Sequence, residues 1–433
     1  MAGDDIFAAG FKETPYWWEA APRPERALQA LPAQVDVAIV GAGFTGLVAA
    51  LTLARAGRNV AVLEAQRLGE GASSRNAGYV GRTLKHSFGS LIDSRGLEGA
   101  LAIYRDARTA YDFVYELVER EGIPCHLRRS GRFMAALSPR HYDGMARELA
   151  IKQRHLGDEF AMVPRPEQHR ETGSDLFQGG AMIPEMGSIH PGLYVNGLIA
   201  AAERAGAGLY DRAAVTNIAR DAGGFTVTTA RGSVKAREVA IATNGYTGRA
   251  TPWLQRRLIP FNGFMVATEI LPRELLDRVA PSNRTYHDWN NNLSYWRRAP
   301  DQDRLLLGWR TGSPTRDLKA KARRLKGRMD QILPDLKDAK LDHVWTGQCA
   351  ATFDAWPHIG SHDGMHYGAG YCFAGVPMGS WFGYKLAQRL LRANDARTAF
   401  DAEGFPTKFY YRGWPWFRPL AVAKFDWEDR RGL

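Results

Sequence analysis

The chain has 433 residues, of which 45% are hydrophobic and 24% are charged. This length exceeds what one simple core needs, and the composition excludes a disordered or fibrous protein. The formal net charge of +11 favours anionic partners such as a nucleic acid, an acidic substrate or a diphosphate group. The dense basic tract at 319–328 has helical spacing, so we interpret it as a solvated helix face and do not expect nucleic-acid binding.

Cysteine usage and the first residues bear on the compartment. Three cysteines, Cys125, Cys349 and Cys372, are too few for a disulfide framework, and their spacing is not that of a metal site. The opening MAGDDIF lacks the basic and apolar regions of a signal peptide. We therefore expect a cytoplasmic protein without a metal. Residues 37–54 are uncharged, but they split into a strand pattern and a helix pattern, so we do not expect a membrane span.

The first 60 residues contain the clearest secondary-structure pattern. Residues 1–30 are rich in proline and aromatic side chains, and we expect an irregular path. VDVAIV at 35–40 is typical of a buried parallel strand, and GAGFTG follows it directly. LVAALTLARAG then has helical spacing up to Gly57, and NVAVLE at 59–64 predicts a second buried strand. This order is typical of an α/β fold.

Helices and short strands alternate over the rest of the chain. Helices are predicted over 97–121 and 139–156, and 125–137 predicts two paired strands around Ser130 and Gly131. A β-meander is predicted over 212–245. Residues 251–344 combine short aromatic strands with two helical stretches, and a last helix is expected over 379–391.

The glycines at 41, 43 and 46 form G-x-G-x-x-G between the first strand and the first helix. Gly41 permits a tight turn, Gly43 lets the backbone approach a pyrophosphate, and Gly46 lets helix and strand pack closely. The diphosphate then meets main-chain N–H groups at the positive end of the helix dipole. Glu64 ends the next strand, where an acid accepts hydrogen bonds from ribose hydroxyls and disfavours the 2′-phosphate of NADP. We therefore predict a dinucleotide cofactor.

The segment after Glu64 decides which dinucleotide is expected. RLGEGASSRNAGYVG at 67–81 is rich in glycine and small residues, which suits a backbone lying against a large planar ligand. With this segment the chain resembles the D-amino-acid-oxidase-like flavoproteins, the group of glycine and sarcosine oxidases, and it looks most like the γ-glutamylputrescine oxidoreductase type. The motifs that carry the resemblance are PYWW at 15–18, GAGFTGL at 41–47, LEA at 63–65, GASSRNAG at 71–78, GSIHP at 187–191, IATNGYT at 241–247, YWRR at 295–298, the run 345–360 and GYCFAG at 370–375.

The resemblance implies the fold and its division. It implies an α/β fold in which a Rossmann-like FAD-binding domain is interleaved with an α+β substrate domain built on a mixed antiparallel sheet. The FAD-binding domain is expected at 31–120, 178–250 and 345–395, and the substrate domain at 121–177 and 251–344. Residues 1–30 would form the irregular lead, and the aromatic tail at 396–433 would cover the substrate domain.

The resemblance also implies which residues contact FAD. Gly41, Gly43, Gly46 and Glu64 would hold the ADP half, and the segment 73–78 would lie beside the ribityl chain and the flavin. The set is completed by Phe44, Thr45, Ala65, Ser73, Ser74, Arg75, Asn76, Gly78, Val215, Thr243, Asn244, Gly245, Cys349, Gly375, Val376, Met378 and Gly379. Cys349 precedes Thr352 by three residues, as in the CxxT segment that tethers FAD through sulfur in monomeric sarcosine oxidase, so a covalent link and a buried structural cysteine both stay open.

The chain departs from the family's common motifs in two places. Ser74 and Ala77 replace two glycines of GASGRNGG. Cys372, Phe373 and Ala374 replace residues of GYSGHG, so a flavin-proximal histidine is missing and Phe373 is expected to narrow the pocket.

The resemblance implies oxidation of a C–N bond in a small primary or secondary amine or amino acid. Hydride transfer to flavin N5 would give an imine that hydrolyses, and the protein would position the amine and exclude water. Substrate contacts are expected from the aromatic insert, although packing is the commoner role of such aromatic side chains. These candidates are His287, Trp289, Tyr295, Trp296 and Arg310.

An arginine suits a substrate carboxylate, with Arg310 as the first choice and Arg82 as the second. His190, which precedes a proline, is expected to stabilise a turn. Oxygen or another acceptor would take the electrons. The alternatives are a dehydrogenase that uses a quinone or similar acceptor, an NAD(P)H-dependent flavin hydroxylase, and a membrane-associated FAD protein supported only by the aromatic tail at 409–419.

Overall fold

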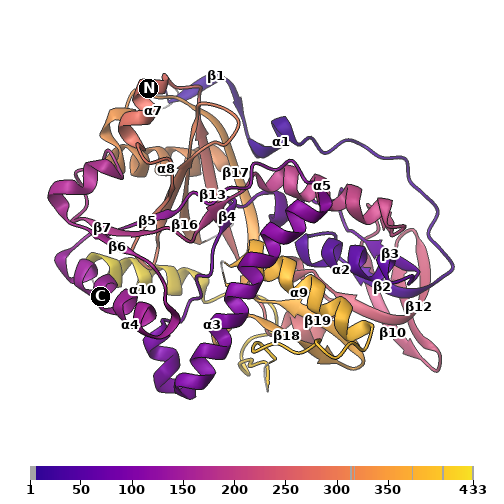
Figure 1. Cartoon of the computed structure of the whole chain (residues 1–433). Helices are drawn as coiled ribbons and strands as arrows, with labels where there is room; N and C mark the ends of the chain where they lie inside the picture. Colours follow the sequence, from indigo (N-terminus) through magenta and orange to yellow (C-terminus); the bar gives the residue numbers. More distant parts are fainter. Residues whose placement is uncertain (1–5, 313–314, 316, 373, 402–403, 432–433) are drawn as a thin grey trace.

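Two large sheets organise the chain in the computed structural model, and Figure 1 shows them in two adjoining halves. The structure describes residues 6–312, 315, 317–372, 374–401 and 404–431, and at 310–312 and 430 it describes the backbone alone. Phe373, which is expected to narrow the pocket, lies outside these residues.

The first half is an eight-stranded sheet with the order β10-β11-β12-β2-β3-β9, in which β19 also pairs with β12 and β18 with β19. The central strands β12, β2, β3 and β9 are parallel, and β10, β11 and β12 form the antiparallel meander that the sequence predicts. The strands are β2 (Gln34–Val40), β3 (Val60–Leu63), β9 (Gly208–Tyr210), β10 (Val215–Asp221), β11 (Gly224–Thr229), β12 (Gly232–Ile241), β18 (His358–His362) and β19 (Met365–Ala369).

The second half is a nine-stranded, mainly antiparallel sheet with the order β1-β17-β13-β16-β15-β14-β5-β7-β6. Only the pairs β1–β17 and β14–β5 within it are parallel. Its strands are β1 (Phe7–Lys12), β5 (Arg132–Ala135), β6 (Ala161–Val163), β7 (Gly180–Ile183), β13 (Ile259–Thr268), β14 (Thr285–Asp288), β15 (Ser294–Arg298), β16 (Leu305–Gly312) and β17 (Leu341–Ala351). A short ribbon of β4 (Tyr79–Val80) and β8 (Gly187–Ser188) completes the pairing.

Helix starts follow from local sequence signals. Ser87, Ser138 and Asp317 accept hydrogen bonds from main-chain N–H groups of the first turns of α3, α4 and α8, which stabilises those helix ends. The helices are α1 (Trp17–Ala20), α2 (Phe44–Arg55), α3 (Phe88–Glu121), α4 (Pro139–Leu156), α5 (Pro191–Arg204), α6 (Pro252–Gln255), α7 (Arg273–Val279), α8 (Leu318–Ile332), α9 (Gly375–Leu390) and α10 (Arg418–Arg431). The 3₁₀ turns are η1 (Ala72–Ser74), η2 (Arg165–Arg170), η3 (Asn244–Tyr246) and η4 (Pro334–Leu336).

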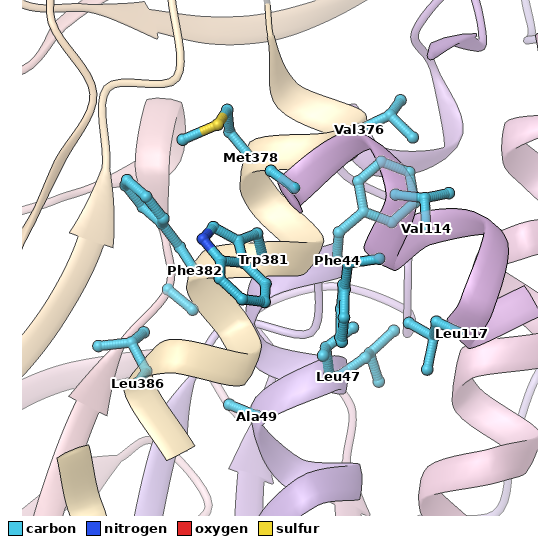
Figure 2. Close-up of a cluster of buried hydrophobic side chains, with 14 of the residues drawn as sticks. Phe44, Leu47, Ala49, Val114, Leu117, Val376, Met378, Trp381, Phe382 and Leu386 are labelled. Carbon is cyan, nitrogen blue, oxygen red and sulfur yellow. The ribbon is translucent and has the colours of Figure 1, made fainter. Parts of the chain in front are cut away.

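A hydrophobic cluster joins α2, α3 and α9 beside the eight-stranded sheet. Figure 2 shows Phe44 and Leu47 of α2 facing side chains of α3 and α9, among them Leu117 and Trp381. Burial of a side chain of this size contributes about 1.5–3 kcal/mol. This packing fixes the start of α2 against the sheet. A separate cluster forms where α8 packs on the nine-stranded sheet, with Leu325 and Met329 against its strands.

Several local predictions are confirmed. The run 35–64 forms β2, α2 and β3, and Gly57 follows α2 with a positive φ of 78°. The uncharged residues 37–54 thus divide between a strand and a helix. α4 has the predicted bounds, and the predicted helix 97–121 is the part of α3 that follows Gly96, whose φ of 70° interrupts the helix.

Other predictions are wrong where pairing is between distant segments. Residues 125–137 do not form two paired strands, because only β5 is a strand and it pairs with β7 and β14. The lead is not wholly irregular, since β1 pairs with β17 and α1 follows it. The expected domain ranges also put 180–183 and 345–351 with the FAD-binding half, whereas β7 and β17 pair in the nine-stranded sheet.

The tail after α9 packs against both halves: Phe400 and Phe405 join the hydrophobic clusters of the eight-stranded half, and the segment from Tyr411 onward approaches the nine-stranded half. Tyr411 is buried and donates a hydrogen bond to the carbonyl oxygen of Leu258 (2.6 Å). α10 then lies against β16 and the loop after β14. None of the described helices has both the length and the apolar character needed to cross a bilayer.

Candidate active site

The turn between β2 and α2 is built for close approach of backbone atoms. Gly41 has a φ of 103°, and a Cβ there would lie 2.9 Å from the Ala242 carbonyl oxygen. A Cβ at Gly46 would overlap the carbonyl oxygen of Gly41, so α2 can meet the strand only with glycine at this position. A Cβ at Gly43 would lie 2.9 Å from Ser73 Oγ. The turn therefore brings the N-terminus of α2 against the segment around Ser73.

Side chains from two other segments hold this turn. The main-chain N–H of Phe44 donates to Ser73 Oγ (3.0 Å), and that of Ala42 donates to Glu64 Oε2 (2.8 Å). Glu64 also accepts from the N–H of Gln66 (3.0 Å), and burial raises the pKa of its carboxyl group. Because the first N–H groups of a helix lack acceptors within the helix, this end is suited to bind a phosphate.

A cavity of about 740 Å³ opens at the carboxyl ends of the parallel strands β2, β3 and β12 and extends to the nine-stranded sheet. This edge is where open parallel sheets bind their ligands. Most of the expected cofactor-binding residues line it: Gly41, Gly43, Phe44, Thr45, Glu64, Ala65, Ser73, Arg75, Asn76, Val215, Thr243, Asn244, Gly245, Cys349, Gly375, Val376 and Gly379.

Four expected residues do not line the cavity, and each has a structural role instead. Gly46 lies at the contact between helix and strand. Ser74 is buried and donates to the carbonyl oxygen of Gly69 (2.6 Å). Gly78 has a φ of 69°, and a Cβ there would overlap the backbone of Ile189. Met378 belongs to the hydrophobic cluster of Figure 2, because it lies on the face of α9 that packs into the core.

The lining fits FAD. Main-chain N–H groups and a carboxylate at the β2–α2 turn match a diphosphate and a ribose, and the glycine-bounded space continues from there along 71–77 to the start of α9. α9 begins at Gly375, so the positive end of its dipole is directed at the cavity.

Only some of the residues expected to contact the substrate line the cavity. His287 on β14 and Tyr295 on β15 are cross-strand partners that both line the cavity, and Trp289 lines it while remaining partly exposed. Trp296 does not line it, because it is buried between Tyr286 and Phe177, with ring centroids 5.4 and 5.8 Å away. The Arg310 side chain lies outside the described part of the chain.

Arg82 and His190, two further residues considered from the sequence, have partners within the protein that account for their positions. Arg82 pairs with Asp158 (2.9 Å) and Glu185 (2.8 Å), so its charge is already compensated, and it does not line the cavity. His190 Nδ1 accepts a hydrogen bond from the N–H of Leu193 (3.1 Å) and caps α5. The turn-stabilising role expected for His190 agrees with this contact.

Sequence reasoning missed Arg132, the first residue of β5. Its side chain is buried and lines the cavity. Its Nε donates to Thr285 Oγ1 (3.3 Å) and its Nη1 donates to Thr83 Oγ1 (3.0 Å). Among the described residues no carboxylate lies within ion-pair distance of Arg132, and burial lowers the pKa of its guanidinium. No feature of the sequence alone separates Arg132 from the other arginines nearby.

The comparisons with known proteins agree with this geometry. The family model described as FAD dependent oxidoreductase (DAO) matches residues 36–389. The chain belongs to this family. It is therefore an FAD-dependent oxidoreductase, and its relatives place it among the enzymes that act on amines or amino acids.

The similarity to individual relatives extends over most of this chain. The chain is 31% identical over 404 residues to the γ-glutamylputrescine oxidoreductase of Escherichia coli (strain K12), covering 92% of this chain and 93% of that protein. It is 28% identical over 386 residues to the glycine oxidase of Geobacillus kaustophilus, covering 86% and 96%. The crystal structure of glycine oxidase from Geobacillus kaustophilus matches with a TM-score of 0.70 at 27% identity, over 88% of this chain and 100% of that one. The family resemblance and the α/β fold are thereby confirmed.

One cluster with metal-ligand chemistry lies outside the cavity. Carboxylate and imidazole atoms of Glu19, Asp342 and His343 lie within 4.8 Å of one another. However, Lys12 pairs with Glu19 (2.6 Å) and Arg304 with Asp342 (2.6 Å), so cationic side chains already compensate both acids. We assign no metal to this cluster.

Proposed function

We propose that the enzyme oxidises the C–N bond of a small primary or secondary amine that carries a carboxylate, and that Arg132 binds this carboxylate. The observation that carries the proposal is a buried guanidinium that lines the cavity and, in the described residues, contacts hydroxyl groups rather than acids. Burying an uncompensated cation costs several kcal/mol, so an anionic ligand at this position is strongly favoured.

The surroundings of Arg132 suit recognition of a carboxylate. The two threonine hydroxyls hold the plane of the guanidinium, and Tyr79 lies under it with the ring centroid 5.2 Å from Cζ. Tyr79 is itself fixed, because its hydroxyl lies 2.8 and 2.7 Å from the carbonyl oxygens of Tyr286 and Trp296. A pre-oriented fork loses little entropy when it binds a carboxylate through two hydrogen bonds.

The remaining cavity side chains would orient the amine and exclude water. Tyr295 contacts Tyr79 edge to face, at a centroid distance of 6.1 Å, so an aromatic wall adjoins the proposed anion site. Bound FAD supplies the acceptor for the hydride of the substrate's α carbon–hydrogen bond. The chain's own contribution is to hold the neutral amine in place in a site shielded from solvent.

Anaerobic mixing with a panel of amines tests the proposal. We expect the visible flavin absorbance to bleach with secondary or primary amines that carry a carboxylate, and far more slowly with the matching amines that lack it. Bleaching by carboxylate-free amines at equal efficiency would overturn the proposal. Bleaching by NADH alone would instead support the flavin hydroxylase alternative.

The electron acceptor and the FAD linkage need separate measurements. Oxygen uptake by the substrate-reduced enzyme would support an oxidase, whereas reduction of a quinone without oxygen uptake would support the dehydrogenase alternative. Cys349 lines the cavity on β17, so a thioether to FAD is a second element to test. Flavin that precipitates with acid-denatured protein would establish the covalent link, and flavin left in the supernatant would exclude it.

A further inference from the structure

The C-terminal tail exposes an unusual number of aromatic side chains although it is held in place. Tyr411 and Phe405 are buried, and Arg418 Nη1 donates to the carbonyl oxygen of Pro260 (2.9 Å). Arg257 Nε also donates to the carbonyl oxygen of Phe405 (2.8 Å). The tail is therefore fixed on both sides of Tyr411, and the exposure of its neighbours is a property of a docked segment.

Large apolar side chains beside and beyond these fixed points face solvent. Phe409 is 90% exposed, Trp414 70%, Leu420 68% and Trp416 55%, and Tyr410, Phe425 and Trp427 are also exposed. Three of the rings are contiguous, because Tyr410 contacts both Phe409 and Trp416, at centroid distances of 5.3 and 6.1 Å. We call residues 408–425 the aromatic platform. A contiguous apolar surface of this kind on a folded protein marks an interaction site.

The charges of the aromatic platform all have one sign. Residues 408–425 contain Lys408, Arg412, Arg418 and Lys424 and no acidic residue, and the acidic residues of α10 begin at Asp426. Lys408 and Arg412 are exposed, and Lys424 is exposed but pairs with Glu428 of α10 at 3.5 Å. Tryptophan and tyrosine rings together with lysine and arginine are the side chains suited to the boundary between lipid headgroups and acyl chains. Cations near that boundary are attracted to anionic lipids.

We propose that the aromatic platform docks the enzyme peripherally on the surface of an anionic lipid bilayer. A second copy of the chain fits less well, because a twofold interface would bring these cationic patches against each other. The sequence alone led us to expect a tail that covers the substrate domain and made membrane contact a remote alternative. In the structure α10 contacts β16, and the rings of Phe409, Trp414 and Trp416 are exposed to solvent.

α10, which contains the end of the platform, also contacts a loop that lines the cavity. Asp429 of α10 accepts hydrogen bonds from the main-chain N–H groups of Asn291 (2.7 Å) and Asn292 (2.9 Å), and Asn291 lines the cavity. α10, drawn in yellow beside the C label of Figure 1, therefore joins the platform to the loop after β14. A docked enzyme would hold this loop next to the bilayer.

Co-sedimentation of the FAD-loaded full chain with vesicles tests the proposal. We expect binding to vesicles of phosphatidylcholine and phosphatidylglycerol at a ratio of about 7:3, which gives a strongly negative surface potential. We expect little binding to vesicles of pure phosphatidylcholine. Added salt should weaken the binding, since it screens the charges.

Two variants separate the contributions. Lys408→Glu/Arg412→Glu should weaken binding to the anionic vesicles by at least about 25-fold, at roughly fivefold for each cation lost. Trp414→Ser/Trp416→Ser should weaken binding to the same vesicles at high salt, where the apolar contribution dominates. The matched control Lys235→Glu/Lys337→Glu changes two exposed lysines elsewhere and should bind as the wild type does.

Flavin content and turnover in solution should stay unchanged in all three variants, which shows that they fold. Equal binding of wild type and Lys408→Glu/Arg412→Glu would overturn the proposal, as would the absence of wild-type binding to anionic vesicles. A wild-type dimer in light scattering that Trp414→Ser/Trp416→Ser dissociates would assign the platform to a second copy instead.

Discussion

The two halves of the molecule shape their parts of the cavity by different means. In the half around β2 and α2, main-chain atoms shape most of that part of the cavity. The side chains of Ser73 and Glu64 hold the turn in place. In the half around the nine-stranded sheet, the cavity is defined by side chains such as Arg132 and Tyr295, which come from different strands. A backbone site tolerates little change in glycine, whereas a side-chain site can change specificity by single substitutions.

This difference separates two kinds of damage. Substitutions in the glycine turn should remove the cofactor, and substitutions in the nine-stranded half should alter substrate recognition or stability while the cofactor stays bound.

The largest effect is expected for Gly46→Ala. The new Cβ would overlap the Gly41 carbonyl oxygen, which is backbone and cannot rotate away, so α2 must move off the strand. We expect the purified variant to contain almost no FAD by absorbance. Retention of FAD at the wild-type level would contradict the role of this turn.

A smaller but still large effect is expected for Trp296→Ala. Trp296 is buried between two aromatic rings in the core of the nine-stranded half, so its removal should lower the free energy of unfolding by about 3–5 kcal/mol. Denaturant unfolding of the FAD-loaded protein measures this. Trp289→Ala, at a partly exposed cavity position, should cost less than about 1 kcal/mol and change KM instead. A larger loss of unfolding free energy for Trp289→Ala than for Trp296→Ala would contradict these two positions.

Acidification should destabilise the fold through His190. Burial lowers the pKa of His190 below its ordinary value, with Asp301 acting against this and His126 and Arg297 adding to it. Below about pH 6.5 the unfolded chain therefore binds a proton that the folded chain does not, and the free energy of unfolding falls.

Between pH 7.5 and pH 5.5, His190 should lower the free energy of unfolding by about 1 kcal/mol. His190→Asn keeps a side chain that can cap α5, and it should reduce the loss by that amount. An identical pH dependence in both proteins would exclude this contribution.

The smallest effect is expected for Gly327→Ala, the same chemical change as at Gly46 but in an open position. Gly327 lies within α8, and a Cβ there would meet no atom within 4 Å. Helix propensity then predicts a gain of about 0.5–1 kcal/mol in the free energy of unfolding, with FAD content unchanged. Destabilisation would show that α8 has a close neighbour that the described residues lack.

The parts of the site that could be predicted from sequence are those that depend on neighbouring residues. The glycine turn and Glu64 follow from a strand, a turn and a helix in direct succession. Arg132 and Arg82 are indistinguishable in the sequence, because the acids that pair with Arg82 lie 76 and 103 positions away along the chain.

The alternation of side chains along a strand could have corrected the expectation that Tyr295 and Trp296 both contact the substrate. Tyr295 and Trp296 are consecutive residues of β15, so their side chains must point to opposite faces of the sheet. Only one of the two can therefore face the cavity. The sheet partners of β7 and β17 had no comparable local signal, since both pairings join segments separated by large parts of the chain.

The most direct test of the account pairs a change in Arg132 with a change in the substrate. The rate of anaerobic flavin reduction would be measured for wild type and Arg132→Met, each with a carboxylate-bearing amine and with its carboxylate-free analogue. We predict that Arg132→Met retains FAD and loses about 10²- to 10³-fold in efficiency with the carboxylate-bearing amine only. Equal losses with both amines, or no loss with either, would contradict the assignment of Arg132 as the carboxylate-binding residue.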